Sequence, residues 1–123
     1  MPIKVLLYDD EADILEICKY VLERKGYEVF TKESCTNVLS DLEQLKPDVV
    51  IMDNWIPDIG GVEATRLIKK DSHLRATPVI LFTANKDIIA LATEAGADAF
   101  IGKPFDLRVM ETTVEKVLAN RSR

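Results

Sequence analysis

The chain has 123 residues, and its 16 basic and 21 acidic side chains give a net charge of −5. This length suits one domain with a real hydrophobic core and is too short for two. Hydrophobic residues make up 47% and charged residues 30%, a globular composition that argues against disorder and against a coiled-coil rod. The acid excess argues against direct nucleic-acid binding, which needs clustered Lys and Arg to neutralise phosphates.

The sequence also bears on the cellular compartment. No apolar run approaches the roughly 20 residues needed to span a bilayer. The start, Met1-Pro2-Ile3-Lys4, lacks the layout of a signal peptide, so we expect a cytoplasmic protein without a membrane partner. Cys18 and Cys35 lack metal-binding spacing and are expected to be reduced thiols, while His73 lies in a polar stretch and is expected in an exposed loop.

Five short apolar runs alternate with longer amphipathic segments along the chain. Several runs are nearly continuous, which is typical of strands buried on both faces of a parallel sheet. The second run alternates instead, as an edge strand does. The expected strands cover residues 3–7, 27–30, 49–52, 79–82 and 99–101.

Helical periodicity fills the gaps between these runs. In the first gap, apolar residues from Ile14 to Leu22, Ile17 among them, recur at helical spacing, which predicts one buried stripe. Gly26 follows the basic Lys25 and indicates a glycine cap at the end of this helix. Four further helices are expected, over residues 38–45, from about 61 to 68, from 87 to 95 and from 106 to 119.

Five strands alternating with five helices specify an α/β domain with a parallel sheet. Right-handed crossovers, with strands added on both sides of the first, place helices on both faces and give a doubly wound (βα)5 sheet. No linker, repeat or low-complexity tract interrupts the pattern, so residues 1–123 are expected to form one domain.

Ligands of a doubly wound sheet bind outside the carboxyl ends of its strands. Four strand ends carry residues that could bind a ligand: Asp9, Asp10 and Glu11 after the first, Asp53 at the third, Thr83 and Ala84 at the fourth, Lys103 and Pro104 after the fifth. Each of these residues has a structural alternative, because Asp and Thr often cap helices and Lys is commonly a surface residue. Three carboxylates, a hydroxyl and a lysine at one edge are harder to explain by capping alone.

This combination suits metal-assisted phosphoryl chemistry. Asp9, Asp10 and Asp53 would repel one another without a cation, and Mg²⁺ (or Mn²⁺) binds few carboxylates together with water and phosphate oxygens. Lys103 offers a positive charge for a phosphate oxygen, and Thr83 offers a hydroxyl donor. Asp53 is the candidate nucleophile, since a carboxylate can form an acyl phosphate.

Four short motifs occur in order along the chain. They are Val5-Leu6-Leu7-Tyr8-Asp9-Asp10-Glu11, Met52-Asp53 with Pro57 and Gly61 four and eight residues after Asp53, Thr83-Ala84, and Phe100-Ile101-Gly102-Lys103-Pro104-Phe105. With these motifs the sequence resembles the receiver domain of the two-component response-regulator family over nearly its whole length. The resemblance implies a flavodoxin-like sheet with strand order 2-1-3-4-5.

The resemblance also implies roles for the acidic residues. Asp53 would accept a phosphoryl group from a histidine kinase or phosphotransfer protein. Asp10, Asp53 and the backbone carbonyl of Trp55 would bind Mg²⁺ directly, and Asp9 would act through water. The chain would then be a signalling domain rather than an enzyme, although it would assist its own phosphorylation and dephosphorylation.

Further residues would sense the phosphoryl group. Lys103 would pair with it, and the peptide bond from Lys103 to Pro104 is cis in this family. Thr83 would move to bond a phosphoryl oxygen, and Phe100 would be the coupled aromatic switch or, alternatively, plain core. The face made by the fourth helix, fifth strand and fifth helix would be read by a downstream effector that the sequence does not identify.

The resemblance also implies that Trp55 and Asn85, at positions where the family varies, would border the route to the phosphoryl group. We hypothesise that the bulk of Trp55 restricts attacking water and lengthens the life of the phosphorylated form. The alternative is that Trp55 packs over its loop or serves a partner interface.

Other functions on a similar fold fit less well. A haloacid-dehalogenase phosphatase needs a second acid where Trp55 stands, and an FMN binder needs a phosphate loop where Asp9, Asp10 and Glu11 would repel phosphate. The runner-up is a phosphorylation-independent interaction module. Only Arg108 and Lys116 are basic in the expected last helix, which gives little support for the dimer face of DNA-binding regulators, yet a phosphorylation-dependent homodimer stays open.

Overall fold

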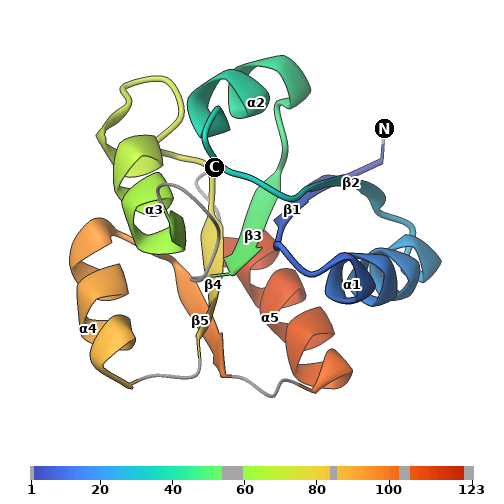
Figure 1. The fold of residues 1–123 in the computed structure, drawn as a ribbon. Coiled ribbons are helices and arrows are strands. Elements are labelled where there is room, and N and C mark those ends of the chain that lie inside the picture. Colours follow the sequence, from blue (N-terminus) through green and yellow to red (C-terminus); the bar gives the residue numbers. More distant parts are fainter. Residues whose placement is uncertain (1, 54–59, 84–85, 103–105, 121–123) are drawn as a thin grey trace.

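The computed structural model describes residues 2–53, 60–83, 86–102 and 106–120. Its centre is a five-stranded sheet in the order β2-β1-β3-β4-β5, and every neighbouring pair is parallel (Figure 1). This is the strand order that the family resemblance implies. The strands are β1 (Lys4–Tyr8), β2 (Glu28–Lys32), β3 (Val49–Asp53), β4 (Val79–Thr83) and β5 (Ala99–Gly102).

One helix follows each strand, and the helices lie on both faces of the sheet (Figure 1). α1 and α5 cover one face, and α2, α3 and α4 cover the other. The helices are α1 (Ala12–Arg24), α2 (Val38–Leu45), α3 (Gly60–Lys70), α4 (Lys86–Ala95) and α5 (Leu107–Asn120). The doubly wound fold predicted from the alternation of apolar runs and amphipathic segments is therefore confirmed.

Two hydrophobic cores, one on each face, hold these layers together. On the α1 and α5 side, Leu22 and Met110 pack with Ile51 of the sheet. On the opposite side, Leu42 and Ile68 pack in the second core, which includes side chains from the other face of the sheet. All five residues of β3 are buried, which explains why its sequence reads as a continuous apolar run ending in an aspartate.

The sequence predicts most element boundaries to within one or two residues, and β2 is an edge strand as expected. Gly26 adopts φ +93 and its N–H donates to the carbonyl of Glu23, so it caps α1 as predicted. The placement of Ile17 in a buried stripe is wrong, because 49% of its surface is exposed. Ile17 lies beside Ile14 and Val21, which are themselves only half-buried at the margin of that stripe.

The remaining expectations about isolated residues hold. Cys18 and Cys35 are both buried thiols, and they belong to the cores on opposite faces of the sheet. His73 is exposed in the turns between α3 and β4. Across the described ranges, no helix is both long and apolar enough to cross a membrane.

At the amino ends of β4 and β5, a single lysine joins three segments. Lys69 of α3 donates from Nζ to the carbonyls of Arg75 and Thr77, at 3.1 and 2.8 Å, and to Asp98 Oδ2 at 2.8 Å. The same Asp98 oxygen accepts the Val79 N–H at 2.8 Å, which fixes the start of β4. These four interactions hold the Lys69 stem in one place.

Gly96 and Gly26 form a matched pair for testing how firmly the Lys69 side chain is held. Both have a positive φ, +99 and +93, so Ala at either position costs about 1–2 kcal/mol of backbone strain. A Cβ at Gly96 would lie 2.9 Å from Lys69 Cγ, whereas a Cβ at Gly26 meets nothing within 4 Å. We expect Gly96→Ala to lower the free energy of unfolding, measured in urea, by about 1 kcal/mol or more beyond the loss in Gly26→Ala, since overpacking adds to the strain. Equal losses would show that the Lys69 stem yields freely.

Candidate functional site

Pairing of β1 with β3 brings two aspartates together at the carboxyl edge of the sheet. Tyr8 lies opposite Met52 in this parallel ladder. The next residue of each strand segment is an aspartate, Asp9 after Tyr8 and Asp53 after Met52. Because the side chains of aligned residues in neighbouring parallel strands project to the same side, Asp9 and Asp53 become neighbours although 44 positions separate them.

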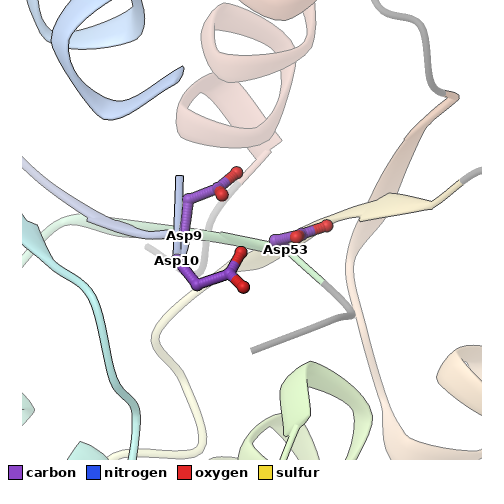
Figure 2. A group of neighbouring side chains, drawn as sticks. All are labelled: Asp9, Asp10 and Asp53. Carbon is purple, nitrogen blue, oxygen red and sulfur yellow. The ribbon is translucent and has the colours of Figure 1, made fainter. Parts of the chain in front are cut away.

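Asp10 completes a cluster of three carboxylates. One carboxylate oxygen from each of Asp9, Asp10 and Asp53 can be chosen so that all three lie within 4.8 Å of one another. Figure 2 shows their carboxyl groups reaching to the same side, Asp9 and Asp10 from the end of β1 and Asp53 from β3. The predicted juxtaposition of the three carboxylates is therefore found.

Burial distinguishes the members of the cluster. Asp9 and Asp53 are 1% and 2% exposed, whereas Asp10 is exposed. Asp9 Oδ1 accepts a hydrogen bond from the Glu11 N–H at 2.9 Å. Asp9 therefore supports the turn into α1, but it does not cap the helix as the structural alternative expected, because the N-cap residue is Glu11.

The donor set fits a hard divalent cation. Two unit charges 4.8 Å apart repel by about 3.5 kcal/mol at an effective dielectric constant of 20, so gathering three carboxylates is costly. All the ligand atoms that the cluster offers are oxygens, which Mg²⁺ and Mn²⁺ favour over the nitrogen and sulfur ligands of zinc sites. Among the described residues, Asp9, Asp10 and Asp53 are the one group of acidic, His or Cys side chains close enough together to hold a metal ion.

The ends of β4 and β5 lie at the same edge of the sheet as the carboxylate cluster. The backbone of Thr83 ends β4 and lies opposite Gly102 of β5, so the segment that leads to Lys103 starts at the same edge.

Phe100 is half-buried and packs against the core on the α2, α3 and α4 side. That position is compatible with both predictions made for Phe100, a switch and a core residue.

Several predicted site residues lie outside the described residues. They are Trp55, Asn85, Lys103 and Pro104. Their roles, including the cis peptide bond between Lys103 and Pro104, stay predictions.

The sequence analysis missed a polar contact made by Tyr8, the residue that precedes Asp9. The Tyr8 hydroxyl donates to Asp41 Oδ2 of α2 at 2.7 Å, and Asp41 Oδ1 lies 3.9 Å from Lys32 Nζ of β2. Burial, and then the bond to Asp41, raise the pKa of Tyr8 well above its usual range, so the phenol keeps its proton. The available clue in the sequence was a tyrosine in the otherwise aliphatic run that leads to Asp9.

Comparisons with known proteins agree on the family. The family model described as the response regulator receiver domain matches residues 5–115. The chain is 32% identical over 117 residues to the alkaline phosphatase synthesis transcriptional regulatory protein PhoP of Bacillus subtilis, covering 94% of this chain and 48% of that protein. It is 34% identical over 116 residues to the phosphate regulon transcriptional regulatory protein PhoB of Pseudomonas aeruginosa, covering 93% and 51%. The chain thus spans about half the length of these curated relatives.

A solved structure gives the same result for the fold. The signal receiver domain of a signal transduction histidine kinase from Syntrophus aciditrophicus superposes with a TM-score of 0.88 at 29% identity, covering 98% of this chain and 94% of that one. The family model spans all of β1 but its first residue, the other four strands, four complete helices and the first part of α5. The chain belongs to the response regulator receiver domain family, a family of signalling domains in two-component phosphorelays.

Proposed function

We propose that Asp53 accepts a phosphoryl group from a phosphohistidine on a histidine kinase or phosphotransfer protein. The single observation that carries this proposal is the carboxylate cluster, in which Asp53 of β3 adjoins Asp9 and Asp10 of β1. Membership of the receiver family supports it, because the chain has an aspartate at the third strand end where the family's phosphoacceptor stands.

The transfer is a substitution at phosphorus. A carboxylate oxygen of Asp53 forms a bond to phosphorus, and the bond between phosphorus and the donor's imidazole nitrogen breaks, so that the electron pair leaves with the imidazole. The product is an aspartyl phosphate. The almost complete burial of the rest of β3 fixes the backbone of Asp53, which holds the nucleophile in place for attack.

The same cluster supports a role for Mg²⁺ or Mn²⁺, which when bound would offset the negative charge that the phosphoryl group brings. Asp10 and Asp53 would bind it directly with the carbonyl of Trp55, and Asp9 would act through water. One oxygen from each of the three carboxylates lies within 4.8 Å of the others, and Asp9 Oδ1 already accepts the Glu11 N–H, which supports an indirect role for Asp9.

Phosphorylation would then change the α4, β5 and α5 face. In this proposal Lys103 pairs with the phosphoryl group, Thr83 turns toward it, and Phe100 repacks in response. A downstream effector would recognise the altered face, and a second copy of the chain is a candidate partner in the phosphorylated state. The half-buried setting of Phe100 supports its repacking, since a fully enclosed ring would have less room to move.

The cation site predicts a specific loss in one variant. Ligand binding to the native state alone raises the free energy of unfolding by about 2.7 kcal/mol at 100 times the dissociation constant. We expect Mg²⁺ to stabilise the wild type in urea unfolding and to have little effect on Asp10→Asn, which lacks one ligand. Asp13→Asn, an exposed position of α1 outside the cluster, is the control and should respond as the wild type does. A full Mg²⁺ response in Asp10→Asn would remove Asp10 from the site.

Phosphorylation itself is tested by mass spectrometry. After incubation with Mg²⁺ and acetyl phosphate, the wild type should gain the mass of one phosphoryl group, and Asp53→Asn should gain nothing because the nucleophile is gone. Asp13→Asn should be modified as the wild type is. If the wild type takes up no phosphoryl group, the runner-up function, an interaction module that works without phosphorylation, is favoured instead.

Trp55 is tested by the lifetime of the phosphorylated form. If its bulk restricts the attacking water, Trp55→Ala should lose the phosphoryl group several times faster than the wild type. The phosphorylated protein is freed of acetyl phosphate and its intact mass is followed over time. An unchanged rate would favour a packing or partner-binding role for this side chain.

A further inference from the structure

Tyr8 ends β1 and lies one residue before the carboxylate cluster. Its side chain is 1% exposed and packs in the core that contains Cys35, Val38 and Met52. An aliphatic or phenyl side chain could fill this space equally well. A buried hydroxyl instead costs free energy unless it finds a hydrogen-bond partner. The hydroxyl of Tyr8 finds that partner on another element, Asp41 of α2.

Asp41 joins Tyr8 to the edge strand as well. Its Oδ2 accepts the Tyr8 hydroxyl at 2.7 Å, and its Oδ1 lies 3.9 Å from Lys32 Nζ. The Asp41 carboxylate is only 15% exposed, so its interactions are little screened by solvent. It also lies in the first turn of α2, where a negative charge is favourable.

The contacts close a ring around the end of β1. Tyr8 is paired with Lys32 in the β1–β2 ladder, and the N–H of Asp9 donates to the carbonyl of Lys32 at 3.1 Å. From Tyr8 the ring therefore runs through Asp41 to the Lys32 side chain, through the Lys32 backbone to the Asp9 N–H, and back to Tyr8. Both the side chain before Asp9 and the backbone of Asp9 itself are held by this ring.

We propose that Tyr8 is a positioning residue for the divalent cation: its hydrogen bond to Asp41 holds the end of β1 so that Asp9 and Asp10 face Asp53. The proposal rests on the proposed function, in which these carboxylates hold Mg²⁺. Mutual repulsion drives like-charged carboxylates apart in the absence of metal, and the ring resists that movement. Ligands held in place before binding lose less freedom on binding, which strengthens the affinity.

The hydrogen bond to Tyr8 and the charge at Asp41 are two separate properties. The Tyr8 hydroxyl donates to Asp41 Oδ2 at 2.7 Å. Asp41 is the acceptor, and an Asn side chain at this position would still offer an oxygen to the hydroxyl. Bond and charge at Asp41 can therefore be separated by substitution.

The test is a Mg²⁺ titration of the full chain, followed by the backbone amide shifts of Asp9, Asp10 and Asp53. In Tyr8→Phe the dissociation constant should rise on the order of 10-fold, the low end of the range for partners that orient metal ligands. Asp41→Asn keeps an acceptor for the Tyr8 hydroxyl and loses only the ion pair with Lys32, so it should weaken binding less than Tyr8→Phe does. Tyr20→Phe, which removes a hydroxyl from a side chain of α1 that is 61% exposed, is the matched control and should not change it.

Affinity separates positioning from general support of the fold. A bond that only stabilises the fold would lower the free energy of unfolding, measured without Mg²⁺, and leave the affinity of the native protein unchanged. That result in Tyr8→Phe would overturn the proposal, as would equal weakening in Asp41→Asn and Tyr8→Phe, which would point to the charge of Asp41. If the wild type binds no Mg²⁺, the proposed function itself fails, and the positioning role of Tyr8 fails with it.

Discussion

The parallel pairing of β1 with β3 is the constraint on which the site depends. It places Tyr8 opposite Met52 and so makes neighbours of Asp9 and Asp53, which a sheet in plain sequence order would separate by β2. A slip of one residue in this register would turn one aspartate toward the opposite face of the sheet. The fully buried β3 and the two cores that cover it resist such a slip, so the apolar packing of both faces also maintains the acidic edge.

The charges at the amino ends and at the carboxyl ends of the strands affect the stability of the fold in opposite ways. At the amino edge, Lys69 and Asp98 form a compensated pair that also accepts and donates to the backbone around β4. At the carboxyl edge, Asp9, Asp10 and Asp53 bring together charge of one sign. The first arrangement stabilises the folded chain by itself, whereas the second brings like charges together and opposes folding unless a cation offsets them.

Much of this structure follows from local sequence patterns. The strands are recognisable because parallel strands that are covered on both faces need runs such as Val49 to Met52, and the ends of those runs locate the acidic cluster. The exposure of Ile17 was not predictable in the same way, because periodicity gives the direction of a side chain but not how far the neighbouring elements extend over it.

Contacts between distant side chains were also beyond the sequence patterns. The bond from Tyr8 to Asp41 spans 33 positions and depends on how α2 docks on the sheet. The bond from Lys69 to Asp98 spans 29 positions and depends on the turns that lead into β4 and β5. Neither pair has a local spacing that marks it, since each partner alone resembles an ordinary strand or helix residue.

The two cysteines can report separately on the opening of the two helical layers. Cys18 lies in the core beneath α1 and α5, and Cys35 lies in the core beneath α2, α3 and α4, with the sheet between them. A thiol reagent can reach each sulfur only when its own layer opens. The rates at which the two sulfurs are alkylated therefore compare the opening of the two layers within one molecule, without any added label site.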